Sequence, residues 1–290
     1  MTDAKRGIPG FETREILWRA TPLRYEVAGE GPSLVLVHGL GGAAANWLLL
    51  APELAGERRV VVPELPGHGG SAPLPAAPHV DAFADALLAV LEAEDALPAV
   101  WVGHSLGGLV ALRAAVRRPD AARGVVLAAA AGVSSTTRAA GAVLAVLGLL
   151  EPGRLIAPFR RSWARSRLGR TLAFGWWGAA DPAALSPEMA EAFLAGPAEH
   201  SDIASAGRAL LVSDPHADLD RVACPCLCLW GTDDNWVPLA DGMEYARRLG
   251  APLRAVAGCG HLLIGERPDA CLAAIRSFLA DLDGTAERAG

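Results

Sequence analysis

The amino-acid sequence predicts an α/β fold, in which a mostly parallel central sheet carries helices on both faces and a helical lid is inserted late in the chain. Three features of the 290 residues support this prediction. Short apolar runs bounded by glycine and proline recur, segments of helical periodicity lie between them, and one long stretch interrupts the alternation. Strands that alternate with helices form parallel sheets, and apolar runs without polar alternation are typical of strands covered on both faces.

Each expected element follows from its local pattern. Two strand-like segments close together, residues 15–20 and 23–32, predict a short antiparallel hairpin at one edge of the sheet. The later strands are expected at residues 33–39, 58–64, 99–105, 124–130, 225–231 and 253–258. Helical periodicity is found at residues 80–94, 106–118, 238–250 and 268–282.

The interruption predicts a core of residues 1–132 and 218–290 and a helical lid of residues 133–217. One apolar run in the lid, residues 142–150, is too short to span a bilayer. The lid also contains tryptophans, which could line a substrate pocket or could simply pack the lid against the core, and both interpretations stay open. These tryptophans are Trp163, Trp176 and Trp177.

Composition limits the class of partner. The formal charge is −6 at pH 7, and 52% of the residues are hydrophobic. A nucleic-acid-binding protein needs a basic face and a disordered segment needs low hydrophobicity, so a folded protein with a small-molecule partner is expected. The first residues carry no export signal and no apolar run is long enough for a membrane span, so we expect a cytoplasmic protein without an integral membrane segment. The sequence carries no signal for an oligomeric state.

The cysteines favour free thiols over a metal site. Cys224, Cys226 and Cys228 alternate, as small apolar side chains on one face of a strand do. The paired CxxC spacing of zinc sites is missing. We therefore expect no metal and no cofactor.

The sequence around Ser105 has the strongest functional signal. An apolar strand leads into Gly103-His104-Ser105-Leu106-Gly107, and a helix follows. A serine on a strained turn between a strand and a helix needs neighbours without side chains, because the two backbones approach closely. This context predicts that Ser105 is a nucleophile, activated by a nearby base.

A base for Ser105 is expected on a later loop, at the carboxyl end of another strand. Of the seven histidines, only His261 follows the last predicted strand directly. The acid that orients the histidine should follow the preceding strand, where Asp233 and Asp234 both qualify. The pattern alone leaves the choice between these two aspartates open.

Acyl transfer also needs donors for the oxyanion that forms in the transition state. Two backbone N–H groups are predicted to supply them, that of Leu106 after the nucleophile and that of Leu40 in the loop after an earlier strand. Glycines on both sides of Leu40 let this loop turn its amides inward. His38 is expected to brace the loop rather than to take part in chemistry.

Five motifs in this order make the chain similar to the α/β-hydrolase superfamily. They are HGLGG at 38–42, LPGHGGS at 65–71, GHSLGG at 103–108, GTDDNWVP at 231–238 and GCGHLLIGERP at 258–268. The resemblance covers about residues 33–130 and 222–283 and leaves out the lid. It implies the α/β-hydrolase fold, a nucleophile elbow at Ser105 and a catalytic triad without a cofactor, in which the acid falls on Asp234. Glu64 stands where the superfamily usually has aspartate, on a loop outside the triad.

The resemblance implies hydrolysis, and we expect a carboxylic ester of a largely apolar small molecule as substrate. The superfamily also includes lactonases, perhydrolases and hydrolases that cleave a carbon–carbon bond in a vinylogous diketone, and fold and triad do not separate these activities. Arginines in the lid could recognise an anionic diketone, or could form a solvated surface. They are Arg138, Arg154, Arg160, Arg161, Arg165, Arg167 and Arg170. A non-enzymatic alternative is a ligand-binding, receptor-like member of the fold.

Overall fold

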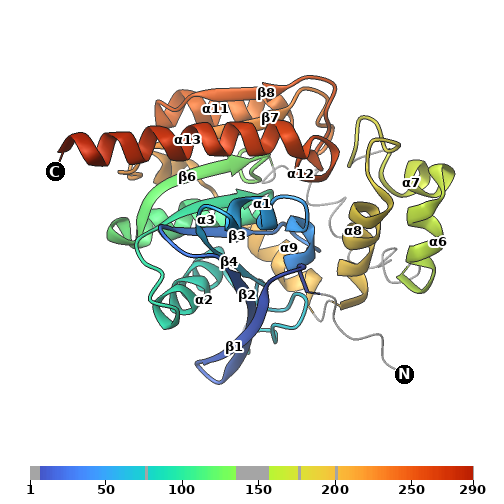
Figure 1. The fold of residues 1–290 in the computed structure, drawn as a ribbon, viewed down its shortest axis with the longest axis horizontal. Helices are drawn as coiled ribbons and strands as arrows, with labels where there is room; N and C mark the ends of the chain where they lie inside the picture. The colour runs from blue at the N-terminus through green and yellow to red at the C-terminus, as the bar shows by residue number, and fades with distance from the viewer. Residues whose placement is uncertain (1–6, 76–77, 135–156, 176–177, 200–201, 290) are drawn as a thin grey trace.

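A computed structural model describes residues 7–75, 78–134, 157–175, 178–199 and 202–289. The described residues contain an eight-stranded sheet with the strand order β1-β2-β4-β3-β5-β6-β7-β8 (Figure 1). Strands β1 and β2 form the expected antiparallel hairpin at the edge, β2 is antiparallel to β4, and the remaining neighbours are parallel. The predicted fold class is therefore confirmed. The strands are β1 Glu12–Trp18, β2 Thr21–Ala28, β3 Ser33–Val37, β4 Arg59–Pro63, β5 Ala99–His104, β6 Ala122–Ala128, β7 Cys226–Gly231 and β8 Leu253–Val256.

The long helices of the core follow the predicted positions, and several elements differ from the prediction in their bounds. Helix α13 continues to Ala289, beyond the predicted end at 282, and β6 begins at Ala122, before the predicted 124. Short helices that the periodicity did not predict follow β3 and β8. The core helices are η1 Ala44–Trp47, α1 Ala51–Ala55, α2 Val80–Ala93, α3 Leu106–Arg117, η2 Pro119–Ala121, α11 Leu239–Leu249, α12 Leu263–Glu266 and α13 Pro268–Ala289.

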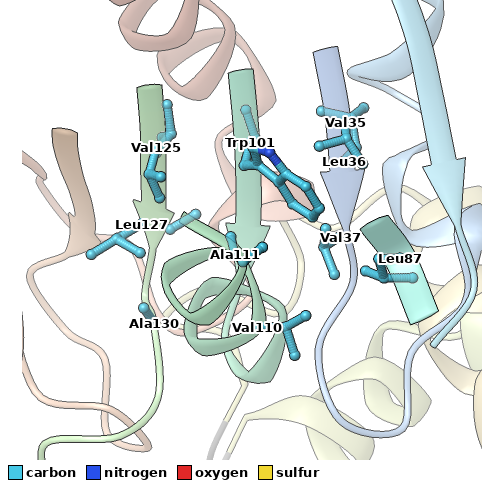
Figure 2. Packing of buried hydrophobic residues seen from close by; sticks show 14 of the residues in the cluster. Val35, Leu36, Val37, Leu87, Trp101, Val110, Ala111, Val125, Leu127 and Ala130 are labelled. Carbon is cyan, nitrogen blue, oxygen red and sulfur yellow. The ribbon is translucent and has the colours of Figure 1, made fainter. Parts of the chain in front are cut away.

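Both faces of the sheet are covered, as the uninterrupted apolar strands predict. On β6, a Cβ added at Gly124 would lie 3.0 Å from the ring of Phe278, so this residue faces α13. The next residue, Val125, points to the opposite face because successive side chains alternate along a strand. Figure 2 shows Val125 in the buried cluster that includes Val110 of α3 and Trp101 of β5. This packing fixes the carboxyl ends of the central strands, where the candidate site lies.

The regular elements that the structure describes between β6 and β7 are all helices, and turns and bends such as residues 178–186 connect them. We call residues 133–217 the insertion. In the view of Figure 1, α6 and α7 lie at the right edge, with α8 between them and the sheet. The apolar run at 142–150 lies outside the described residues. Among the described helices of the whole chain, none combines the length and the apolar character needed to cross a membrane. The elements of the insertion are η3 Ala157–Phe159, α6 Arg160–Arg165, α7 Arg167–Phe174, α8 Pro187–Glu199, α9 Ile203–Leu211 and α10 His216–Leu219.

Candidate active site

Ser105 occupies a strained turn between β5 and α3. Its φ of 53° lies in the left-handed region, which residues with a side chain rarely adopt. A Cβ at Gly103 would lie 2.2 Å from the carbonyl oxygen of Gly107, and a Cβ at Gly107 would lie 2.3 Å from that of Val37. The Ser105 N–H donates to the Ala128 carbonyl at 3.0 Å, which binds the turn to β6. The two glycines therefore permit the close approach that this turn requires, and the serine is held in one place.

His261 and Asp234 form a buried pair on the two loops that follow β8 and β7. Nδ1 of His261 donates to Oδ2 of Asp234 at 2.8 Å. Oδ1 of Asp234 accepts the N–H groups of Trp236 and Val237, both at 2.8 Å. Because Nδ1 carries the proton, Nε2 of the neutral imidazole is left as an acceptor. The aspartate thus orients the histidine and is itself fixed by the backbone.

The alternative aspartate, Asp233, lies at the surface of the same loop. It is exposed, and its carboxylate accepts a hydrogen bond from the hydroxyl of Thr232 at 3.4 Å. Its N–H donates to the Cys259 carbonyl at 2.9 Å. The structure therefore pairs His261 with Asp234, the residue that the family motif indicates.

His104 connects the loop of His261 to the turn of Ser105. Nε2 of His104 donates to the His261 carbonyl at 2.9 Å, and the two rings are 5.0 Å apart between centroids. Burial, and after it the neighbouring His261, lower the pKa of His104 to about 3. His104 is therefore neutral above acidic pH, and its role is to hold two loops together at this edge of the sheet.

The loop that carries Leu40 packs directly against the serine. A Cβ at Gly39 would lie 3.0 Å from the Cβ of Ser105, and the Gly42 N–H donates to the Gly39 carbonyl at 3.0 Å across a tight turn. Leu106 is the first residue of α3, so its N–H is among those that have no partner within the helix. Both predicted oxyanion donors thus belong to segments that meet at Ser105.

His38 and Glu64 make hydrogen bonds that stabilise this loop and the neighbouring segment of residues 65–70. Nε2 of His38 accepts the Leu65 N–H at 3.1 Å, and its Nδ1 donates to the Gly39 carbonyl at 2.8 Å. The buried carboxylate of Glu64 accepts the Gly70 N–H at 2.6 Å. These contacts agree with structural roles for both residues.

In the described part of the chain, the contacts given for the predicted tryptophan and arginines are mainly to other residues of the insertion. Trp163 packs against an apolar cluster of the insertion, while Trp176 and Trp177 lie outside the described residues. Arg138 and Arg154 also lie outside them. Arg160 and Arg161 pair with Glu191, and buried Arg170 donates to the carbonyls of Ala164 and Pro182. Arg165 and Arg167 are exposed.

The thiol of Cys259 does not compete with Ser105 as a nucleophile. All five are free, and Cys226 and Cys228 are buried in β7. Burial raises the pKa of the Cys259 thiol, the one closest in sequence to His261, to about 12. The reactive thiolate is therefore suppressed at neutral pH. Within the described ranges, no group of three or more His, Cys, Asp or Glu side chains could hold a metal ion.

Two buried carboxylates near the site were not singled out from the sequence. Glu266 accepts N–H groups on both sides of the boundary between core and insertion, and Asp241 accepts the N–H and hydroxyl of Ser134 at 2.9 and 2.7 Å. A charged residue inside the apolar run HLLIGE was the available signal for Glu266. A single carboxylate has no characteristic spacing, so its partners emerge only in three dimensions.

Comparison with known proteins gives three informative relatives. The chain is 34% identical over 221 residues to the dihydrolipoyllysine-residue acetyltransferase component of an acetoin cleaving system from Pseudomonas putida, covering 74% of this chain and 55% of that protein. It is 30% identical over 280 residues to 2-hydroxymuconate semialdehyde hydrolase from Pseudomonas sp. (strain CF600), covering 94% and 95%. It is 31% identical over 231 residues to pimeloyl-[acyl-carrier protein] methyl ester esterase from Vibrio atlanticus (strain LGP32), covering 78% and 86%.

A family model agrees with the motifs and with the fold. The model described as "Alpha/beta hydrolase family" matches residues 34–274, which includes the segments of Ser105, Asp234 and His261 as well as the insertion. The relatives include hydrolases that match most of this chain. The chain belongs to the alpha/beta hydrolase family.

Proposed function

We propose that this protein is a serine hydrolase that cleaves a carboxylic ester of a largely apolar small molecule through an acyl-enzyme intermediate. The observation that carries the proposal is the 2.8 Å hydrogen bond from His261 Nδ1 to Asp234 Oδ2, on loops beside the strained turn of Ser105. A histidine oriented by a buried carboxylate is the base that a serine nucleophile needs. The methyl ester esterase among the relatives supports an ester as substrate.

In the proposed reaction, the Ser105 hydroxyl attacks the ester carbonyl while its proton passes to His261 Nε2. The alcohol then leaves with that proton, and a water molecule activated by the same histidine releases the acid. The Asp234 carboxylate stabilises the imidazolium that forms in each half of the reaction. The N–H groups of Leu40 and Leu106 would bind the oxyanion, and loss of one such donor typically costs about a hundred- to thousandfold in rate.

The insertion is proposed to cover the site and to select the substrate. Residues 1–132 and 218–290 would then supply the chemistry, and residues 133–217 the walls of the pocket. Trp163, Trp176 and Trp177 are the proposed aromatic lining. The contact from Asn46 Nδ2 to the Ala192 carbonyl, at 3.5 Å, supports this arrangement because it joins the segment after Leu40 to α8 of the insertion.

The proposed nucleophile is tested with a fluorophosphonate probe and a short-chain 4-nitrophenyl ester. The wild type should be labelled once and should turn the ester over repeatedly, whereas Ser105→Ala should show no labelling and a fall in kcat of at least about 10⁴-fold. Equal labelling of both proteins would reject Ser105. A labelled wild type that never completes a second turnover would favour the ligand-binding alternative.

A second candidate function is cleavage of a carbon–carbon bond in a vinylogous diketone. Its support is the match to 2-hydroxymuconate semialdehyde hydrolase over nearly the whole length of both chains. Hydrolysis of a lactone and formation of a peracid would use the same triad, so both activities are measured beside ester and diketone cleavage. Measuring kcat/KM on matched esters, lactones and diketones, with Ser105→Ala as the blank, decides between them; a diketone preferred over every ester would replace the ester proposal.

A further inference from the structure

The carboxylate of Glu266, five residues after His261, is buried and accepts three backbone N–H groups. Oε2 accepts those of Gly260 at 3.2 Å and Ala180 at 3.1 Å, and Oε1 accepts that of Asp181 at 3.1 Å. Gly260 directly precedes His261, while Ala180 and Asp181 belong to the insertion. One carboxylate therefore joins the histidine loop to residues that lie 86 and 85 positions earlier in the chain.

The residue on the other side of His261 is bound to the same segment. The Leu262 N–H donates to the Gly178 carbonyl at 2.7 Å, and the Leu262 side chain is buried in the apolar cluster of the insertion. A Cβ at Gly260 would lie 2.7 Å from the Ala180 nitrogen, so the two backbones are in close contact. Both neighbours of His261 are therefore attached to the insertion, and neither attachment involves the imidazole.

Hydrogen bonds offset the burial of the Glu266 carboxyl group. Burial raises the pKa of Glu266, and the three N–H donors together with Arg267 oppose that shift. A buried carboxylate is unfavourable unless its oxygens are hydrogen-bonded, and hydrogen bonds to a charged acceptor are stronger than neutral ones. The donor set satisfies the carboxylate, and the carboxylate in turn fixes three backbone positions around the histidine.

We infer that Glu266 is a positioning residue for the reaction proposed above: it holds the backbone of His261 where the imidazole meets Asp234, and it ties that position to the insertion. The inference rests on the proposed function only in taking His261 as the base. A misplacement of about 1 Å in a catalytic group is enough to cost about a hundredfold in rate. A role limited to global stability would instead make any equally buried carboxylate equivalent to Glu266.

Three variants separate these roles. Glu266→Ala removes all three acceptor contacts, whereas Glu266→Gln keeps an amide oxygen that can serve Gly260 and Ala180 and loses the contact to Asp181. The control is Glu26→Ala in β2, because Glu26 is equally buried and accepts a backbone N–H, from Ile8 at 2.6 Å; it also pairs with Arg24 at 3.3 Å, so its loss is a demanding control for stability. Glu266→Asp, which withdraws both oxygens by one methylene, replaces the alanine variant if that variant does not fold.

The first readout needs no substrate. The proton that His261 donates to Asp234 should give a strongly downfield ¹H NMR signal, assigned by its loss in His261→Ala. Glu266→Ala should lose or broaden this signal well below its melting temperature, whereas Glu266→Gln and Glu26→Ala should retain it. A wild type that cleaves no ester would fail the proposed function and leave this readout intact.

The second readout is the division between kcat and KM on a short-chain 4-nitrophenyl ester. Glu266→Ala should lower kcat by about 10- to 100-fold with a much smaller change in KM, because the position of the base changes and the substrate contacts do not. Glu266→Gln should recover most of the lost rate. The inference is overturned if Glu266→Ala keeps both the NMR signal and kcat, or if Glu26→Ala loses them to the same degree.

Discussion

Two regions of the molecule differ in how closely they are packed: the edge of the sheet that carries Ser105, and the outer face of α7 in the insertion. At the edge, an added methyl group on Gly103 would meet backbone at 2.2 Å, and both oxygens of Asp234 have fixed partners. In the insertion, Leu168 and Leu172 of α7 leave 68% and 58% of their surface exposed. At Gly103 the edge therefore leaves no room for an added atom, whereas the outer face of α7 is open to solvent.

The two regions are joined at a small set of described polar contacts. Glu266 connects the histidine loop to the insertion, Asp241 holds Ser134 where the insertion begins, and Asn46 contacts α8. Each contact places a backbone group of the insertion relative to a helix of the core. These contacts therefore fix the described parts of the insertion relative to the core.

The largest effect should come from breaking the pair that orients the base. Asp234→Asn should lower kcat by about 10³- to 10⁴-fold, because an amide that donates to Nδ1 places the imidazole proton on Nε2, where it cannot accept from Ser105. Steady-state kinetics on an ester measures this loss. The neighbouring Asp233→Asn should stay within about twofold of wild type, since a surface change away from special contacts has little effect. Equal losses in the two variants would contradict the pairing.

The second-largest effect is expected when a glycine in each region is replaced by alanine, which adds one methyl group. Gly103→Ala should lower the free energy of unfolding by about 2–3 kcal/mol, because the new Cβ overlaps backbone that cannot move. Gly207→Ala, in α9 of the insertion, should be neutral or stabilising by up to about 1 kcal/mol, because its Cβ would lie 3.9 Å from the nearest atom and alanine favours helix. Chemical denaturation of both variants measures the two values; similar destabilisation would remove the distinction.

Acid should act on the core through its buried histidines. Burial lowers the pKa of His68 to about 4, below the ordinary value of about 6.5. Between these values the unfolded chain binds a proton that the folded chain excludes, so this histidine makes the free energy of unfolding fall as the pH falls, by up to about 1.4 kcal/mol per pH unit. Urea unfolding of the wild type and His68→Gln between pH 7 and pH 4.5 should give a shallower dependence for the variant. Parallel curves would contradict the neutral, buried state of His68.

The smallest effect is expected on the outer face of the insertion. The double change Leu168→Ser and Leu172→Ser should alter the free energy of unfolding by less than about 0.5 kcal/mol, because neither side chain is buried. The control is Leu185→Ala, a fully buried residue of the insertion, which should lose about 2–5 kcal/mol. A large loss in the serine variant would show that the outer face is packed in solution.

Much of the core was predictable because its signals are local. The apolar runs that became β3 to β8 and the glycines around Ser105 depend on neighbours within a few residues. Helix α12 and the extra turns of α13 were not expected, because four residues are too few for a period and the end of a helix depends on its packing. The division into core and insertion, and the pocket role of the tryptophans, stay predictions.

By itself, the sequence determined the order of strands and helices, the turn at Ser105 and the place of the candidate base after the last strand, since all three depend on short-range patterns. The local pattern left Asp233 and Asp234 open and the family motif indicated Asp234; the tertiary structure shows that Asp234 meets His261, and it alone shows that Glu266 joins the histidine loop to the insertion. The groups in these contacts are 27 and 86 residues apart in the sequence. They meet only because the packed sheet places their segments side by side, and a local pattern holds no information on that distance.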